Sequence, residues 1–431
     1  MTALQDSPST APEVLIEEAR RRQRRRRASL AGVAATLAAV AAAFWFSSGG
    51  GRSSGGAALP RPGGSTLPTA TWHELSAPGG YLAGAELTNV FPFDGELLTF
   101  GYISERWPSY KRMHVGPVSC AQGCGPAIWG STDGGARWRP IYVFRSNDGI
   151  DSVVRVGREV LIFAGNDLWR STGGRHWLRV SLPTALRLVP AGRQVVAQGS
   201  RLVLTGTEQG SPGTQEFWTS TDGGDHWSRS HLSLSWQAGA SLIAGGHEFV
   251  VVGQRNGGWS AGWVDGGPTI WRSVNGVSWT SSSLPLPLDD YVTATASGRN
   301  MVVEGESGGP MLDLRSTTVF LRSVNGLAWS RVVAPSALTD QSRHGRPLLV
   351  AADGGLLAYV QSRGAISQLW WSRTGARWRR LRVRGAPPPD FRFEAVGLDG
   401  RSLIFIDQAY RAEYGVPTGG NIFWRLDLQV H

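Results

Sequence analysis

The feature that most limits how this chain can fold is a short phrase that recurs along most of its length. Two long copies read WGSTDGGARW from residue 129 and WTSTDGGDHW from residue 218. Four shorter copies keep a serine, a turn with glycine and a closing tryptophan, and they read WRSTGGRHW, WRSVNGVSW, LRSVNGLAW and WWSRTGARW. The closing tryptophans are separated by 39, 50, 52, 50 and 49 residues. A period of about 40 to 50 residues is typical of a propeller or another repeat array.

The phrase itself predicts a β-hairpin. The two long copies share the pattern S-x-D-x-G-x-x-W, formed by Ser131, Asp133, Gly135, Trp138, Ser220, Asp222, Gly224 and Trp227. Serine and aspartate side chains bond backbone amides inside tight turns, and glycine supplies a positive φ. Two short copies contain Asn-Gly, which is a strong hairpin signal. We therefore expect structural turns, each with a tryptophan that packs against the neighbouring sheet.

These phrases resemble the Asp-box, or BNR, repeat of the sialidase superfamily, and the resemblance runs from about residue 71 to the C-terminus. Similar propellers occur in photosystem II assembly factors and in sortilin-type receptors. The resemblance implies an all-β propeller in which the boxes lie on the rim, away from any ligand. It also implies that the serines and aspartates of the phrase have a structural role. The chain is similar to the non-catalytic or unassigned members of this superfamily.

The repeats predict seven blades of four antiparallel strands. Apolar runs that read as second strands occur at 97–101, 161–165, 201–206, 249–253, 301–305, 356–360 and 403–407. The last unit ends at NIFWRLDLQVH and has no turn phrase and no fourth strand after it. The segment Trp72–Ser76 resembles the strand that follows other turn phrases. We therefore expect this segment to complete the last blade, which closes the ring and removes an unpaired edge.

The N-terminal region predicts a membrane anchor. Residues 1–27 form a basic tail, and residues 28–47 begin with a long uncharged run, ASLAGVAATLAAVAAAFWF. These 19 residues of helix would be about 28 Å long, close to the thickness of a bilayer core. The preceding arginines orient the tail toward the cytoplasm. Residues 48–70 are a Gly, Ser and Pro linker, and residues 71–431 are the extracytoplasmic propeller. A cleaved signal peptide is the alternative.

Charge and cysteine content narrow the class of protein. The net charge is +10, but outside the tail it is spread over a large domain, which argues against binding nucleic acid. The only cysteines, Cys120 and Cys124, lie in one segment and predict a local disulfide outside the cell. Two cysteines and the nearby His114 do not make a metal site. The sequence gives no sign of a cofactor.

The segments between second and third strands predict the functional face. They are expected at about 102–127, 207–216, 254–269, 306–318, 361–367 and 408–420, on the face opposite the turn phrases. Loops on a rigid scaffold are where binding residues concentrate. The candidate binding residues are Arg106, Trp107, Tyr110, Arg255, Trp259, Trp263 and Arg411. Aromatic rings with charged groups suit a glycan or a peptide, although the same rings can pack the loops against each other.

Two functions remain open at this stage. The first is a membrane-tethered module that binds a protein, a glycan or the cell wall. The alternative is an exo-glycosidase of sialidase type, for which Tyr410, Glu413 and Tyr414 are the candidate catalytic residues. The resemblance implies a Phe/Tyr-Arg-Ile-Pro motif near the start of a catalytic domain, and this sequence has none. A binding role is therefore the main prediction.

Overall fold

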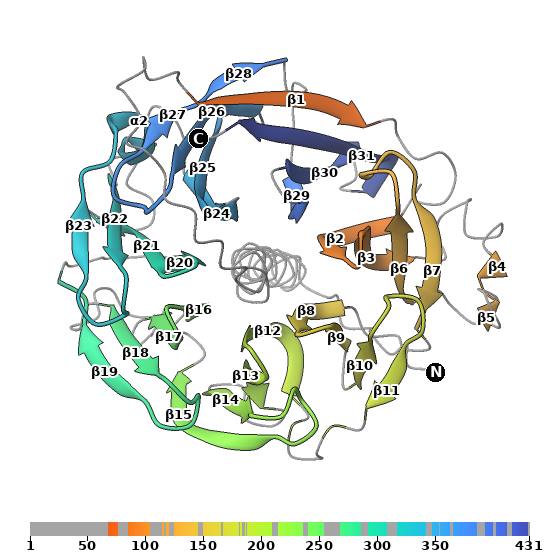
Figure 1. The fold of residues 1–431 in the computed structure, drawn as a ribbon, viewed down its shortest axis with the longest axis horizontal. Coiled ribbons are helices and arrows are strands. Elements are labelled where there is room, and N and C mark those ends of the chain that lie inside the picture. The colour runs from red at the N-terminus through yellow and green to blue at the C-terminus, as the bar shows by residue number, and fades with distance from the viewer. Residues whose placement is uncertain are drawn as a thin grey trace, which may run out of the picture.

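A computed structural model shows a ring of small antiparallel sheets (Figure 1). It describes residues 68–75, 85–103, 114–115, 118–119, 125–144, 150–164, 167–180, 182, 186, 188–208, 214–235, 240–253, 268–285, 292–307, 317–341, 347–352, 354–362, 365–385, 393–399, 402–411 and 416–429 of the chain. Seven sheets make up the ring, each built on four antiparallel strands, and one of them carries a fifth strand, so the prediction of a seven-bladed propeller is confirmed.

The first four blades follow one another along the chain. Blade 1 contains β2 (Ala85–Phe93), β3 (Glu96–Ile103), β6 (Pro126–Ser131) and β7 (Arg139–Val143). Blade 2 contains β8 (Ile150–Val156), β9 (Glu159–Ala164), β10 (Asp167–Ser171) and β11 (Leu178–Val180). Blade 3 contains β12 (Leu188–Gln198), β13 (Arg201–Glu208), β14 (Thr214–Ser220) and β15 (Ser228–Ser235). Blade 4 contains β16 (Ser241–Gly245), β17 (Glu248–Gly253), β18 (Thr269–Ser273) and β19 (Thr280–Ser283).

The remaining elements complete the ring. Blade 5 contains β20 (Val292–Ser297), β21 (Asn300–Ser307), β22 (Thr317–Ser323) and β23 (Ser330–Val332), followed by the short helix α2 (Ser336–Thr339). Blade 6 contains β24 (Pro347–Ala352), β25 (Gly355–Ser362), β26 (Ala365–Ser372) and β27 (Arg379–Arg380). Blade 7 contains β29 (Phe393–Asp399), β30 (Ser402–Arg411), β31 (Val416–Gln429) and β1 (Thr69–Leu75). A small hairpin of β4 (His114–Val115) and β5 (Val118–Ser119) lies between β3 and β6 in the chain.

The fourth strand of blade 7 comes from the other end of the described chain, as predicted. Strand β1 pairs antiparallel with β31 over its whole length, from Thr69 opposite Gln429 to Leu75 opposite Phe423. The strand begins at Thr69, so the last two residues of the predicted linker already belong to the ring. Figure 1 shows β1 and β31 side by side on one side of the ring.

Blade 7 carries one strand more than the repeat predicts. Strand β28 (Arg382–Arg384) continues the outer strand of blade 6 and pairs parallel with Thr69–Thr71 of β1. The backbone N–H of Arg382 also donates to the carbonyl oxygen of Pro68 at 3.0 Å. The exposed edge of the closing strand is therefore covered at its start, which protects it from pairing with another chain.

The hydrophobic core is divided among the spaces between blades. Each of the seven clusters of buried apolar residues joins two neighbouring blades. One cluster includes Trp72 of blade 7 and Trp371 of blade 6, and another includes Phe423 of blade 7 and Trp138 of blade 1. A row of seven blades with free ends would have six such spaces, so the seventh cluster shows that the ring is closed.

The closing tryptophans of the repeated phrase hold neighbouring blades together. The ring centroids of Trp138 and Phe423 are 4.8 Å apart, across the space between blades 1 and 7. Trp227 of blade 3 contacts Phe163 of blade 2 at 6.0 Å, and its Nε1–H donates to the carbonyl oxygen of Gly224 at 2.9 Å. The bond to Gly224 satisfies the polar atom of the Trp227 indole, while the rings of that indole fill an apolar gap.

The predicted membrane anchor, 28–47, lies outside the described residues. Within the ranges given above, no helix has the length and apolar character needed to cross a bilayer.

Candidate functional site

The serine and aspartate side chains of the long phrases are engaged within their own turns. The Ser131 hydroxyl donates to Asp133 Oδ1 and accepts from the backbone N–H of Gly135, both at 2.8 Å. Ser220 makes the same two bonds, to Asp222 Oδ1 and from the N–H of Gly224, again at 2.8 Å. These bonds fix the backbone of each turn. The serine oxygens are also buried, so they lie away from any dissolved substrate.

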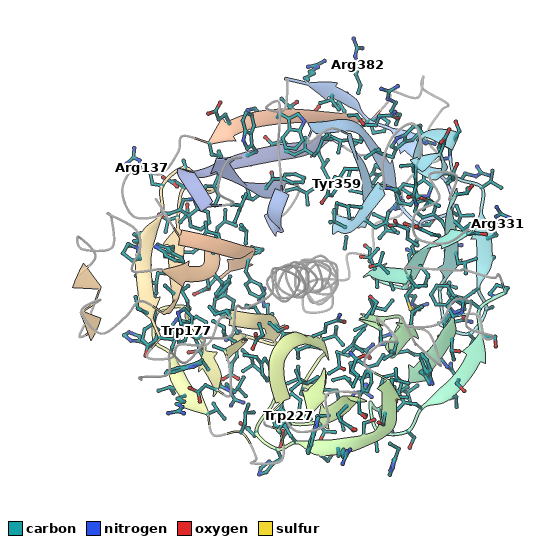
Figure 2. The ribbon with its side chains drawn as sticks, turned by 180° about the vertical axis from the view of Figure 1, so that it is seen from behind. Arg137, Trp177, Trp227, Arg331, Tyr359 and Arg382 are labelled. Carbon is teal, nitrogen blue, oxygen red and sulfur yellow. The ribbon has the colours of Figure 1, made fainter. Side chains whose placement is uncertain are left out.

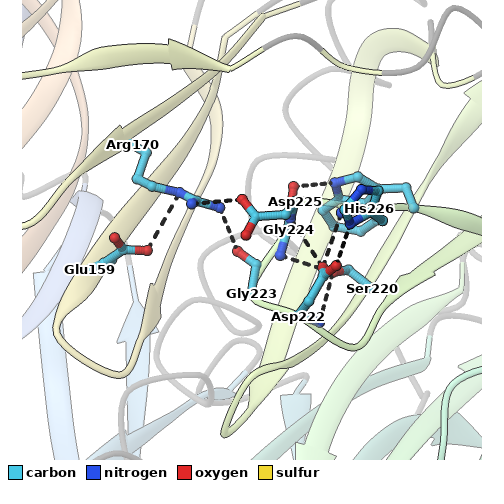
Figure 3. A network of polar contacts seen from close by, with 9 residues as sticks. Glu159, Arg170, Ser220, Asp222, Gly223, Gly224, Asp225 and His226 are labelled. Carbon is cyan, nitrogen blue, oxygen red and sulfur yellow. Dashed lines mark hydrogen bonds and ion pairs between the residues drawn. The ribbon is translucent and has the colours of Figure 1, made fainter.

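One turn brings a serine, an aspartate and a histidine together, but in an order unsuited to nucleophilic catalysis (Figure 3). Asp222 lies between the other two, with its Oδ2 atom 2.6 Å from His226 Nδ1. The Ser220 hydroxyl donates to the aspartate, whereas an activated serine must donate to the histidine. The backbone N–H of His226, followed by its ring and the Ser220 hydroxyl, holds the pKa of Asp222 well below its usual range.

Beside this turn, Arg170 of β10 links blade 2 to blade 3 (Figure 3). Its Nη1 atom lies 2.7 Å from Asp225 Oδ1, and its Nη2–H donates to the carbonyl oxygen of Gly223 at 3.1 Å. Its Nε atom lies 3.4 Å from Glu159 of its own blade. Only 19% of the side chain is exposed, which strengthens charge pairing compared with a surface pair.

The residue directly before the serine of the repeated phrase, which is Arg170 in blade 2, also links other pairs of blades. Arg322 of blade 5 donates from Nε to the carbonyl oxygen of Thr374 in blade 6 at 2.5 Å. Arg322 also donates from Nη2 to Asn300 Oδ1 at 3.1 Å within its blade. In blade 3 the position is Thr219, whose hydroxyl lies 3.4 Å from the carbonyl oxygen of Asn275 in blade 4. The turn face is thus held together by polar bonds between neighbouring repeats.

The opposite face carries the connections between second and third strands, because successive antiparallel strands turn at alternate ends. The longest connections between the ends of these strands are 104–125, 209–213, 254–268 and 308–316, in blades 1, 3, 4 and 5. In contrast, first and second strands are joined by two residues in each blade whose connection is described in full. The asymmetry between the two faces therefore agrees with the sequence for these four blades.

The structure corrects the other two predicted loops. The segment 361–367 is almost entirely strand, because β25 runs to Ser362 and β26 starts at Ala365. The segment 408–420 is a long hairpin, in which Tyr410 pairs with Pro417 and Arg411 with Val416. A glycine lies in each short connection, at 364 and 415, and glycine is typical of tight hairpins. These strand extensions lie beyond the apolar runs, so the sequence pattern predicts loop at both places.

Most candidate binding residues lie outside the described residues, on the connections of blades 1 and 4. This group comprises Arg106, Trp107, Tyr110, Arg255, Trp259 and Trp263. Tyr410 and Arg411 are placed at the end of β30, at the tip of blade 7, while Glu413 and Tyr414 fall in the undescribed connection that follows. Cys120 and Cys124 also lie outside the described residues. The structure therefore places two of the candidates, Tyr410 and Arg411, at one blade tip.

A buried glutamate of blade 5 and a buried tyrosine of blade 6 lie near enough for the charge of one to act on the other, and neither was among the predicted site residues. Glu304 of β21 is 1% exposed and Tyr359 of β25 is 5% exposed. Burial, and then the charge of Glu304, raise the pKa of the Tyr359 hydroxyl well above its usual range. Figure 2 shows Tyr359 inside the wall of the ring. The available signal was a glutamate within the apolar run MVVEG.

Metal coordination has no support among the described residues, because no three His, Cys, Asp or Glu side chains there are grouped to hold an ion.

Comparisons with known proteins give a likeness in fold and identify no family. No protein-family model matches the sequence, and no curated protein matches it. An acylaminoacyl peptidase in complex with Z-Gly-Gly-Phe-chloromethyl ketone is similar in structure at a TM-score of 0.50 and 12% identity, over 84% of this chain and 54% of that chain.

Two further structures match at lower similarity. YCF48 bound to D1 peptide has a TM-score of 0.46 and 15% identity, covering 84% of this chain and 97% of that one. An α-L-arabinofuranosidase from Fusarium graminearum has a TM-score of 0.37 and 12% identity, covering 84% and 98%. The chain is a seven-bladed β-propeller by its sheet order.

Proposed function

We propose that the protein is a membrane-tethered, extracytoplasmic binding module of the Asp-box type, which holds a protein, glycan or cell-wall partner on its long-loop face. The long-loop face is defined by the connections 104–125, 209–213, 254–268 and 308–316, together with the tip of the β30–β31 hairpin. The turn face is defined by the repeated phrases. The tether is the N-terminal segment, with its span at 28–47 and its basic tail in the cytoplasm.

The observation that carries this proposal is the contrast between the two faces. On the turn face, the polar side chains of the phrases bond to their own turn or to the next blade, as Ser131 and Arg170 do. Groups committed in this way have little capacity left for a ligand. The long-loop face has a rigid base of paired strands and long connections, which is the usual arrangement of a binding surface.

The composition of the long connections supports a partner with apolar and polar groups. The connection of blade 1 holds Arg106, Trp107 and Tyr110, and that of blade 4 holds Trp259 and Trp263. Tryptophan and tyrosine are enriched at interaction hot spots because they offer a large rigid surface with a polar group. The same rings stack on sugar faces or on peptide side chains, so a glycan and a peptide are the two partner classes to test.

The experiment presents the full chain, purified in detergent, to a glycan array and to a phage library of displayed peptides. The variant Trp259→Ala with Trp263→Ala removes two rings from the long-loop face. The matched control is Val274→Ala with Leu327→Ala, which removes exposed apolar groups of the turn face. We expect a ligand that the control retains and the tryptophan variant loses by at least about tenfold in affinity.

The opposite pattern, with binding lost in the turn-face variant alone, contradicts the proposal. Glycosidase activity is tested on the same preparations with fluorogenic sialosides and other glycosides. Release of the fluorophore that disappears in Glu413→Gln would establish the hydrolase instead of the binding module.

A further inference from the structure

The outer strand of blade 6 carries a row of arginines that continues onto the edge of blade 7. We call residues 377–384 the arginine strip; its five arginines are Arg377, Arg379, Arg380, Arg382 and Arg384. All five side chains are exposed, and the sequence from 373 to 385 contains no acidic residue. Leu381 is only 3% exposed and its N–H donates to the carbonyl oxygen of Leu369 at 2.9 Å, which fixes the strip to the ring.

Outer-strand arginines of blades 1, 2 and 3 form ion pairs with a nearby carboxylate. The ion pairs are Arg139–Glu96 at 3.0 Å, Arg179–Asp167 at 2.6 Å and Arg229–Glu216 at 2.7 Å. Within the described part of the chain, no carboxylate lies at ion-pair distance from the five arginines of the strip. Arg331 of β23 resembles the strip in this respect, but it is a single charge. Among the residues that the structure describes, the strip is therefore a local concentration of positive charge without a paired carboxylate.

The strip presents its charge away from the ring. Side chains alternate along a strand, so Arg380, Arg382 and Arg384 lie on the side opposite the buried Leu381. Figure 2 shows Arg382 projecting outward from the rim. Val383 lies on the same side as Leu381 and is 36% exposed. Guanidinium groups in such a row match phosphate groups spread over a surface, because each can bind phosphate through two parallel hydrogen bonds.

The N-terminal segment joins the ring at this strip. The Pro68 carbonyl accepts from the N–H of Arg382, and Thr69–Thr71 pair with Arg382–Arg384. Residues 48–67 are the proposed linker, and a coil of this Gly-rich composition has an end-to-end distance of about 25 Å. A membrane held by residues 28–47 would therefore lie at a root-mean-square distance of about 25 Å from the strip, so even weak contacts are favoured by a high effective concentration.

We propose that the arginine strip binds the head groups of anionic phospholipids in the membrane that carries the anchor. This inference rests on the proposed tethering. The strip supplies positive charge, and a bilayer with anionic lipids supplies a negative surface that attracts basic segments. Because the strip lies on the rim, binding to the bilayer orients the plane of the ring perpendicular to the membrane surface. Both faces then remain accessible, and the long-loop face points along the membrane.

The test uses the full chain reconstituted into phosphatidylcholine vesicles, with or without phosphatidylglycerol. Phenylglyoxal modifies exposed arginines, and mass spectrometry gives the rate at each site. We expect modification of the strip to slow by about tenfold when phosphatidylglycerol is present. The exposed Arg137 and Arg331, which project from other parts of the rim (Figure 2), serve as internal references and should react equally in both vesicles. Equal rates at the strip in both vesicles would overturn the proposal.

A second measurement separates this inference from the tether. In a flotation assay, protein that is anchored in the bilayer rises with both kinds of vesicle. Protein that is not anchored rises only with the vesicles that it binds through its charge. For protein added to preformed vesicles, we expect the variant Arg380→Gln, Arg382→Gln, Arg384→Gln to bind phosphatidylglycerol vesicles about 100-fold more weakly than wild type. The control Arg137→Gln, Arg158→Gln, Arg299→Gln removes the same charge elsewhere and should bind as wild type does.

Each outcome of the flotation has one meaning. Failure to rise with phosphatidylcholine vesicles after reconstitution contradicts the tether, while the two triple variants still decide the role of the strip. Equal weakening in both triple variants would show that net charge alone matters and would overturn the site. Binding of heparin or DNA through the strip, without binding to vesicles, would also overturn it, because the occupant would then be a soluble polyanion.

Discussion

The ring of Trp72 lies 5.1 Å from the ring of Phe405, centroid to centroid, with 55° between their planes. Trp72 belongs to β1, at the start of the described chain, and Phe405 belongs to β30, near its end. Trp72 also meets Trp424 edge-on at 6.4 Å. These contacts lie in the cluster that joins blades 6 and 7. One aromatic residue therefore joins strand β1, which follows the predicted linker, to the last blade of the ring.

Replacing Trp72 by alanine should destabilise the whole ring. The side chain is 6% exposed, and truncation of a buried tryptophan costs about 3–5 kcal/mol in free energy of unfolding. Urea unfolding followed by tryptophan fluorescence and by circular dichroism measures the loss. Leu178→Ala, at a residue 71% exposed, is the control and should change the stability by less than about 0.5 kcal/mol. Similar midpoints for the two variants would contradict the role of Trp72.

The closure of the ring by strand β1 could be predicted because it follows from the number of repeated units. Seven apolar second strands were visible in the sequence, the seventh unit had no fourth strand, and Trp72 had the right neighbours to supply one. Strand β28 was not predicted, although residues 380–384 alternate polar and apolar side chains as RLRVR. Its pairing with Thr69–Thr71 joins segments from distant parts of the chain, and no local pattern identifies such a partner.

Two glycines with the same backbone conformation should respond differently to alanine. Gly276 and Gly298 have φ values of 77° and 61°, so alanine strains the backbone at both. A Cβ at Gly276 would lie 2.7 Å from both Thr219 Oγ1 and Val203 Cγ2, whereas a Cβ at Gly298 meets nothing within 4 Å. We expect Gly298→Ala to cost about 1 kcal/mol and Gly276→Ala about 1–3 kcal/mol more. Thermal unfolding of both variants checks this order.

An equal loss of stability in the two glycine variants would mean that backbone strain alone explains the glycine of the repeated phrase. The contact with Thr219 of the preceding blade would then not matter.

The Asp222→Asn variant should make the protein less sensitive to acid. The pKa of Asp222 is lower in the folded protein than in the unfolded chain, where it is near 3.8. Its carboxylate therefore contributes stability above about pH 4, and this contribution is lost as the pH falls below that value. Asparagine accepts the same backbone bonds without titrating, as Asn275 does from Val277 at 2.9 Å.

Urea unfolding of wild type and Asp222→Asn at several pH values between about 2 and 7 measures this difference. Wild type should be the more stable protein at neutral pH, and the gap should narrow as the pH falls below about 4. A gap that stays constant would contradict the charged role of Asp222 in the turn.

Loss of the Arg170 guanidinium should loosen the contact between blades 2 and 3. Arg170→Met keeps most of the side-chain volume, but it leaves Asp225 and the carbonyl oxygen of Gly223 without their donor. We expect a loss of about 1–3 kcal/mol in the free energy of unfolding, as for other hydrogen bonds to charged groups. The exposed Arg158→Met is the control. Hydrogen exchange should rise at the 220–227 turn in the first variant alone, and unchanged exchange there would contradict the link.

The candidate site was only partly predictable, for a physical reason. Turn phrases have strong local signals, so the roles of Ser131 and Asp222 follow from their spacing. The ends of strands in blades 6 and 7 are set by pairing between neighbours, and Tyr410 and Arg411 extend β30 without an apolar pattern. The closeness of Glu304 and Tyr359 depends on how two blades pack, which no local pattern of residues records.

The most direct test of the account is a cross-link between the two ends of the ring. Thr69 and Gln429 face each other in the pairing of β1 with β31. Thr69→Cys and Gln429→Cys are introduced together after Cys120 and Cys124 are replaced by serine, and the control pairs Thr69→Cys with Ser281→Cys of blade 4. Mild oxidation followed by peptide mass spectrometry should find the 69–429 disulfide in the folded protein and none in the control. Free thiols at both 69 and 429 in the folded protein would contradict the closed ring and the proposed point of tether entry.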